Sequence, residues 1–266
     1  MIGIIAGAGS LPIAACHTLK KQQQTFCVIS LASHDNGIAL QQIAGSKEVI
    51  PLAFYKISTI LDQLKKLKVT HVLMIGKFDK KQLLQQVKFD WLAVKLLASV
   101  MYKTDQDLLQ RIVDELSSHG INVLKQHEVL VGLLTKPGIL TGHIDNELQQ
   151  NINFGMQVAN DISKLDIGQT VAIKDRMILA VEAIEGTDAC IKRSIELGGG
   201  KVIICKSAQA AHNPQFDLPT LGSTTLQSLK PGQVQAIAWL ASHTLIADRD
   251  AFIKAAQDRD ITLVAI

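Results

Sequence analysis

The stretch "IGIIAGAGSLP" at residues 2–12 decides the fold that we predict for this chain. An apolar run at 2–6 ends in a Gly-Ala-Gly turn, and a helical pattern follows it. A strand that leads through a glycine-rich turn into a helix is typical of the first unit of a parallel sheet with crossover helices. Glycines at this turn also let a phosphate approach the N–H groups at the helix start. The stretch therefore predicts a Rossmann-like beginning, with Gly7, Gly9 and Ser10 as candidate ligand-binding residues.

The glycine turn is an incomplete dinucleotide-binding fingerprint. Pro12 stands where the third glycine belongs, and no acidic residue follows the second predicted strand before Asp35. A tight turn without a ligand is therefore an equal alternative at this point.

The same alternation of apolar strands and helical patterns continues to the end of the chain, which predicts an α/β protein. In the first half we expect strands at 2–6, 26–31, 48–53, 71–76 and 121–124, and helices at 10–23, 57–68, 80–101 and 105–119. In the second half we expect strands at 170–175, 177–183, 201–205, 234–240, 244–247 and 261–266, and helices at 145–164, 187–197 and 250–258. The strands at 170–175 and 177–183 resemble a hairpin.

Residues 125–142 contain Pro and Gly without clear periodicity, so we place a domain junction there. The prediction is a Rossmann-like N-terminal domain at 1–130 and a catalytic C-terminal α/β domain at 131–266. A chain of 266 residues is long enough for two such cores.

The composition indicates a globular protein, with 47% hydrophobic and 19% charged residues and a formal net charge of +3. Lys and Arg are in mild excess at 65–103, where a solvated helix face is favoured over an anionic partner. The four cysteines lie far apart without CxxC spacing, and the apolar start lacks the basic residues of a signal peptide. We therefore expect a cytoplasmic protein with reduced thiols.

The segment "AVEAIEGTDA" at 180–189 gathers acidic residues at the end of an apolar run. We expect Thr187 to cap the following helix, leaving free N–H groups beside Glu182, Glu185 and Asp188. In the functional interpretation one or more of these acids binds a hard divalent cation while the N–H groups face a phosphate. A helix cap with acids in its first turn, and no ligand, is the alternative.

The stretch at 206–225 is long for a loop in a compact domain, and such loops are often functional. Pro214 and Pro219 stiffen it around Asp217. An acid held in a rigid loop is a candidate base or metal ligand, and an ordinary turn residue is the alternative.

Several motifs together resemble the LpxI-type UDP-2,3-diacylglucosamine pyrophosphatases of lipid A biosynthesis. They are "IAGAGSLP" at 5–12, "KTDQDLLQRIVDEL" at 103–116, "LDIGQ" at 165–169, "LAVEAIEGTDACIKR" at 179–193, and Lys206 followed eleven residues later by "DLPTLG" at 217–222. One position departs from the family's pattern: Gln215 stands where arginine is common, so a charge contact to the phosphates is in doubt.

The resemblance implies a Rossmann-like domain, a family-specific α/β domain, and hydrolysis of the substrate's pyrophosphate to UMP and 2,3-diacylglucosamine 1-phosphate with Mg²⁺ or Mn²⁺. It assigns the critical acid to Asp217. The expected metal ligands are Asp217, Asp188, Glu185 and Glu182. The expected substrate-binding residues are Gly7, Gly9, Ser10, Gly186, Thr187, Lys206 and Thr220.

The implied partners are a lipid-linked UDP-sugar and, transiently, the inner face of a membrane, with no nucleic acid. The oligomeric state stays open, with a homodimer among the alternatives. Two other functions also stay open: a nicotinamide-dependent oxidoreductase, against which Pro12 counts, and a non-catalytic module that binds sugar nucleotides.

Overall fold

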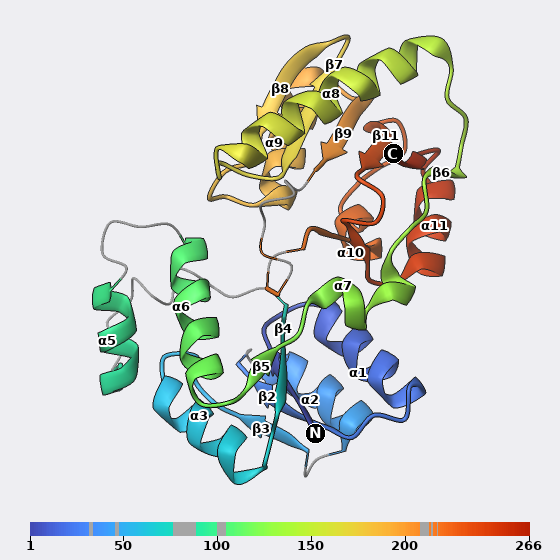
Figure 1. Cartoon of the computed structure of the whole chain (residues 1–266). Coiled ribbons are helices and arrows are strands. Elements are labelled where there is room, and N and C mark those ends of the chain that lie inside the picture. The colour runs from blue at the N-terminus through green and yellow to red at the C-terminus, as the bar shows by residue number, and fades with distance from the viewer. Residues whose placement is uncertain are drawn as a thin grey trace. The chain divides into compact units, whose positions relative to one another are not determined.

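The computed structural model describes residues 1–31, 34–45, 48–76, 89–99, 105–207, 213, 215–216 and 218–266. The chain divides into two compact units, each of which is described by itself (Figure 1). Unit 1 comprises Met1–Leu130 with Asn213–Phe216, and unit 2 comprises Val131–His212 with Asp217–Ile266. No helix in these described ranges has the length and apolar character needed to cross a membrane.

Unit 1 is built on a parallel sheet whose strand order is β3-β2-β1-β4-β5. Its strands are β1 (Ile2–Ala6), β2 (Phe26–Ser30), β3 (Val49–Pro51), β4 (His71–Ile75) and β5 (Asn122–Val123). Its helices are α1 (Leu11–Lys21), α2 (His34–Ala44), α3 (Ile57–Lys66), α5 (Trp91–Ser99), α6 (Asp105–Ser118) and α7 (Gln126–Val129). The order reverses at β1, because the chain builds outward through β2 and β3 and then returns to add β4 on the other side. Ligands of such sheets bind at this switch point, beyond the carboxyl ends of the strands.

Both faces of this sheet are covered by helices, which is why its strands are apolar at nearly every position. Alternate residues such as Ile5, Ile29 and Met74 pack in one core with α3, α5 and α6. Helices α1 and α2 contact each other on the other side of the sheet (Figure 1). Pro12 in the first turn of α1 suits that place, because the N–H that it lacks has no acceptor within a helix.

Unit 2 contains a mixed sheet with the strand order β6-β13-β11-β9-β7-β8. Its strands are β6 (Gly138–Thr141), β7 (Thr170–Lys174), β8 (Met177–Val181), β9 (Val202–Lys206), β11 (Val234–Trp239) and β13 (Thr262–Ala265), and a separate parallel pair joins β10 (Thr220–Leu221) to β12 (Leu245–Ile246). Its helices are the 3-10 turn η1 (Val131–Leu133), α8 (Asn146–Lys164), α9 (Thr187–Gly198), α10 (Ser223–Leu226) and α11 (Arg249–Gln257). Strands β9, β11 and β13 are parallel, while β7 runs antiparallel to both β8 and β9.

Two cores lie on opposite faces of the sheet of unit 2. Helix α8 packs on one face through residues such as Leu148 and Ile152, against Val171 and Cys205. Helices α9, α10 and α11 cover the other face around the fully buried Trp239. All four cysteines are buried and free, and burial raises the pKa of the Cys205 thiol to about 12.

The α/β prediction is confirmed, including the hairpin of β7 and β8. The short elements α7, η1 and β10 were not predicted, and neither were α2 and β6. Helix α2 has neither a clear apolar stripe nor a basic last turn, and β6 is an edge strand with two exposed residues inside the stretch assigned to the junction. Half of the helix expected at 80–101, namely residues 80–88, 100 and 101, lies outside the described residues, and α5 occupies Trp91–Ser99.

Candidate active site

The glycine turn of unit 1 lies at the carboxyl end of β1, beside the end of β4. The N–H of Gly7 donates to the carbonyl of Ile75 over 2.8 Å, and this bond joins the turn to β4. Gly9 has φ +99°, a left-handed conformation that favours glycine, and a Cβ placed there would meet no atom within 4 Å. Ser10 precedes α1 without a side-chain cap. The turn therefore leaves open space at Gly9, next to the positive end of a helix.

Gly76 follows β4 and lies directly against the glycine turn. It was not among the residues predicted from the sequence. A Cβ at Gly76 would lie 2.8 Å from Pro12 Cγ and 2.9 Å from the carbonyl carbon of Gly7. Its φ is +100°. Only glycine lets the end of β4 approach the turn this closely, so Gly76 fixes the shape of the turn.

Lys206 is the centre of a second group of candidate residues, in unit 2. It ends β9, its side chain is only 4% exposed, and its Nζ donates to Thr170 Oγ1 over 3.0 Å and to Thr187 Oγ1 over 2.9 Å. The carboxylate of Glu182 lies 3.7 Å away through Oε2. Lys206, Glu182 and Thr187 were predicted as site residues, and the structure brings them together. Thr170 joins them because it is paired with Lys206 across β7 and β9.

Glu182 is a mostly buried carboxylate that is held in its charged form. Burial raises the pKa of Glu182, but the Lys206 ammonium and nearby hydroxyl and backbone groups outweigh it, so the net pKa lies below the ordinary value. Glu182 Oε1 accepts a hydrogen bond from Thr187 over 2.8 Å. No hydrogen bond of ordinary geometry reaches Oε2 from the described residues. Among the described residues, the cation nearest to this buried oxygen atom is the Lys206 ammonium.

Gly168 determines how closely the chain can pass Glu182. A Cβ at Gly168 would lie 2.1 Å from the Glu182 carbonyl oxygen, so any side chain there would displace the backbone that carries the carboxylate. This gives a structural reason for the glycine in "LDIGQ" at 165–169.

Thr187 does not cap α9, which corrects the prediction. Gly186 is the N-cap, with φ +85° and no side-chain bond, and the Thr187 hydroxyl is used by Glu182 and Lys206 instead. The first backbone bond of the helix runs from the N–H of Cys190 to the carbonyl of Gly186. The amides before Cys190 therefore have no acceptor within the helix, which is typical of helix ends that bind anions, and Thr187 in this turn contacts the Lys206 ammonium.

Glu182, Glu185 and Asp188 do not form a metal cage by themselves, and the prediction that one or more of them binds a metal together with Asp217 stays a prediction, because Asp217 lies outside the described residues. Among the residues that the structure describes, no three His, Cys, Asp or Glu side chains could hold a metal ion together. Glu185 Oε1 pairs with Arg193 at 2.9 Å, so cations of the protein already neutralise two of the three acids. Asp188 is exposed in the first turn of α9, and no ion pair with a described residue engages it.

Asp217 lies outside the described residues, but three residues shortly before it in the chain contact unit 1. Phe216 is buried in the core of unit 1, and Asn213 donates to Gln110 Oε1 over 2.6 Å. Gln215 donates through Nε2 to the Val123 carbonyl over 2.8 Å. The residue that departs from the family's pattern therefore anchors the loop on unit 1, and Asp217 follows where the chain returns to unit 2.

Thr220 is half-buried in β10, where its hydroxyl donates to the Leu218 carbonyl over 3.4 Å. No hydrogen bond within the described ranges joins Thr220 to the group around Lys206.

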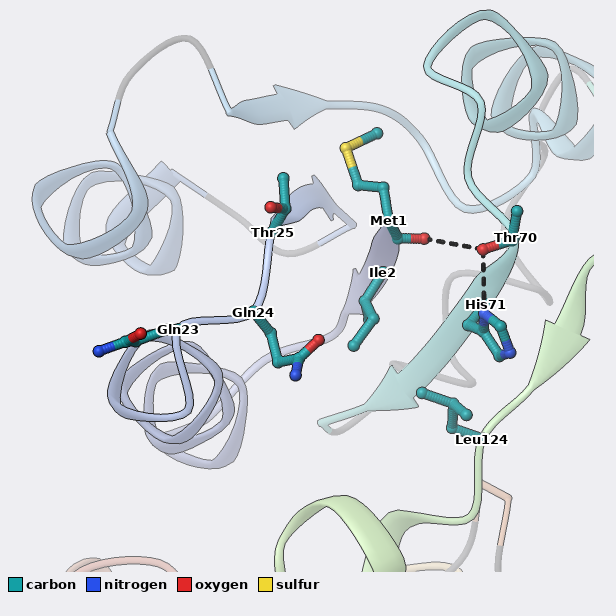
Figure 2. Close-up of a pocket in the computed structure, with 8 residues that line it drawn as sticks. All are labelled: Met1, Ile2, Gln23, Gln24, Thr25, Thr70, His71 and Leu124. Atoms are coloured by element: carbon teal, nitrogen blue, oxygen red, sulfur yellow. Dashed lines mark hydrogen bonds between the residues drawn. The ribbon is translucent and has the colours of Figure 1, made fainter.

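A depression of about 490 Å³ in unit 1 lies away from the glycine turn. Figure 2 shows its lining, in which Met1, Thr25 and Thr70 stand at or just before the starts of β1, β2 and β4. These are the amino ends of parallel strands, and the glycine turn lies at the carboxyl ends. The depression is therefore no part of the candidate site.

Comparisons with known proteins cover the whole chain. The family model described as the LpxI N-terminal domain matches residues 1–133, and the model of the LpxI C-terminal domain matches residues 136–264. A relative from Caulobacter vibrioides, named UDP-2,3-diacylglucosamine pyrophosphatase LpxI, is 27% identical, with 100% of this chain and 97% of the relative aligned.

Proposed function

This chain belongs to the LpxI family, and from that premise we propose that it hydrolyses the pyrophosphate of UDP-2,3-diacylglucosamine to UMP and 2,3-diacylglucosamine 1-phosphate, a step of lipid A synthesis. The observation that carries the proposal is that both family domains match, in order, over 1–133 and 136–264. The named activity of the Caulobacter relative, which aligns end to end, supports it.

The geometry of unit 2 suits a pyrophosphate. The open amides of α9 begin beside Thr187, the Thr187 hydroxyl accepts a hydrogen bond from Lys206, and both the amides and the ammonium favour negative charge. In our mechanism the oxygen of water attacks one phosphorus, the bridging P–O bond breaks, and the departing phosphate carries away the electron pair. Asp217 accepts the proton of the attacking water. Lys206 positions Thr187 and Glu182 rather than touching the substrate, because it is nearly fully buried.

A divalent cation fits the acids of this chain, although those among the described residues form no cage. Mg²⁺ is commonly held by one or two carboxylates, with phosphate oxygens and water completing its shell. Asp188 and Asp217 are the residues that we assign to it, because Glu182 and Glu185 already face Lys206 and Arg193. When bound, the ion supplies charge stabilisation to the phosphates and lowers the pKa of water.

Removing the metal should abolish turnover and spare folding. Chelation with EDTA is expected to reduce UMP formation to background, and Mg²⁺ or Mn²⁺ should restore it, because helix ends alone contribute only about 0.3–2 kcal/mol towards an anion. The assay measures the UMP that the purified protein releases from UDP-2,3-diacylglucosamine. Full activity in EDTA would remove the metal from the mechanism.

Replacing Gly9 with alanine should raise KM by about tenfold or more, since a Cβ would occupy open space at the glycine turn. The matched control is Gly120→Ala, which also has positive φ and empty space around its Cβ but lies after α6, at the far end of β4 and β5. Each change should cost about 1–2 kcal/mol of unfolding free energy through backbone strain. An equal KM for both variants would leave the glycine turn with a structural role only.

The other two functions make different predictions. A nicotinamide-dependent oxidoreductase would bind the nicotinamide cofactor at the glycine turn, and a non-catalytic module would bind the UDP-sugar equally well with and without EDTA.

The proposed substrate carries two acyl chains, so we place the enzyme at the cytoplasmic surface of the inner membrane.

A further inference from the structure

The solvent face of α5 is apolar, which is unusual for a surface helix. Among the α5 side chains that the structure describes, four are exposed and spaced as one helical face, namely Trp91, Val94, Lys95 and Ala98, while Leu92, Ala93 and Leu96 are buried. Trp91 is 73% exposed and Val94 is 52% exposed. The ammonium of Lys95 lies 5.9 Å from the Trp91 ring centroid. We call these four exposed residues the α5 face.

The base of the α5 face is held firmly within unit 1. Asp90 precedes the helix and accepts from the N–H of Ala93 over 2.9 Å and from the N–H of Ser58 over 2.7 Å. One carboxylate thus caps both α5 and α3. The N–H of Asp90 donates to the Tyr55 carbonyl, and the Tyr55 ring packs edge-on against Phe89 with centroids 6.3 Å apart. Trp91 therefore stands exposed next to residues that are bonded to the rest of unit 1.

The sequence around the α5 face is rich in both lysine and aromatic residues. Residues 54–103 hold ten of the chain's 27 basic residues, three of its 24 acidic residues and six of its eleven aromatic residues. The rest of the chain therefore carries an acidic excess. Five of these lysines are described, namely Lys56, Lys65, Lys66, Lys68 and Lys95, and of the two described acids Asp90 is occupied as a cap.

We infer that the α5 face docks on an anionic lipid surface, with Trp91 at the level of the headgroups. Trp combines a large apolar ring with an N–H and suits the boundary between hydrocarbon and water. Val94 and Ala98 are aliphatic, so they gain by leaving water but offer nothing to a nucleic acid. The lysine excess of unit 1 attracts anionic headgroups, whereas a second copy of the chain would bring like charges together. The inference rests on the proposed function. It adds the surface through which an enzyme that acts on a lipid reaches the membrane.

Tryptophan fluorescence tests this docking without any substrate. Trp239 is fully buried and donates to Thr135 Oγ1 over 2.8 Å, so a change in emission on adding vesicles reports on Trp91. We expect a blue shift with vesicles of phosphatidylcholine and phosphatidylglycerol, and a much smaller one with phosphatidylcholine alone. No shift with the anionic vesicles, or a shift with single-stranded RNA in their place, would overturn the inference.

Vesicle flotation of variants then assigns the contact to the α5 face. Trp91→Ala should weaken binding by about tenfold, and Lys95→Glu by at least about fivefold. The matched controls are Val131→Ser and Lys254→Glu, which change an exposed apolar residue and an exposed lysine of unit 2 and should bind as the wild type does. Equal weakening by the controls would contradict the inference. The vesicles contain no UDP-linked lipid, so failure here leaves hydrolysis untouched, and failure of hydrolysis leaves this result standing.

Discussion

The Asp217→Asn variant should lose turnover by at least about a thousandfold, or some 4 kcal/mol of transition-state stabilisation. Asparagine keeps the size of the side chain but removes the charge that a hard cation needs and the basicity that activates water. The melting temperature should change little, and the substrate should still bind. Turnover of purified variants, with binding measured separately, gives this result.

A matched control separates catalysis from turn formation. Asp175 lies in the turn between β7 and β8 with φ +49°, so Asp175→Asn makes the same chemical change in an ordinary turn. Asparagine tolerates such backbone angles, and this variant should keep normal activity and stability. If Asp217→Asn behaves like its control and stays within tenfold of normal turnover, the catalytic acid lies elsewhere, and Asp188 is the next residue to test.

The Lys206→Met variant should lose about 3–5 kcal/mol of unfolding free energy, because it leaves Glu182 buried without its cation. Turnover should also fall, since the Thr187 hydroxyl loses the donor that fixes the start of α9. A second change, Glu182→Gln, should restore most of the stability but not the turnover. Recovery of turnover in the double variant would show that the pair has only a structural role.

The pH dependence of the free energy of unfolding is an independent test of the ion pair between Lys206 and Glu182. In the wild type the pKa of Glu182 is lowered. The contribution of Glu182 to the free energy of unfolding is therefore present above the ordinary glutamate pKa, and it is lost as the pH falls through the lowered pKa. In Lys206→Met, burial is left as the main influence and should raise the pKa of Glu182. The loss of unfolding free energy caused by the buried charge is then full at neutral pH. It becomes smaller as the pH falls through the raised pKa of Glu182. Lys174→Met removes a lysine that is bonded, within the described part of the chain, only to the Gly198 carbonyl, and it should show no such reversal.

The sequence predicts the fold well because most strands of both sheets are buried on both faces and read as short apolar runs. Strand β6 escaped prediction because it is an exposed edge strand, and α2 because its surroundings do not impose a strong apolar stripe. The candidate site was predicted less completely. Thr170 and Lys206 are 36 residues apart and meet only through the antiparallel pairing of β7 with β9, which no local pattern reveals.

The side-chain partners of Glu182, Glu185 and Thr187 were not evident from the sequence. Glu182 and Glu185 resemble a metal cluster in the sequence because their cations, Lys206 and Arg193, come from later elements. Thr187 resembles a helix cap because Ser and Thr often occupy that position. Gly186, with a backbone conformation that favours glycine, takes the position instead and frees the hydroxyl for Lys206.

Product analysis with the pure lipid substrate tests the central claim most directly. The protein, UDP-2,3-diacylglucosamine and Mg²⁺ are incubated together, and the nucleotide and lipid products are separated and quantified. We predict UMP and 2,3-diacylglucosamine 1-phosphate in equal amounts, with no UDP and no free sugar lipid. Formation of UDP with diacylglucosamine, or recovery of unchanged substrate, would contradict the account.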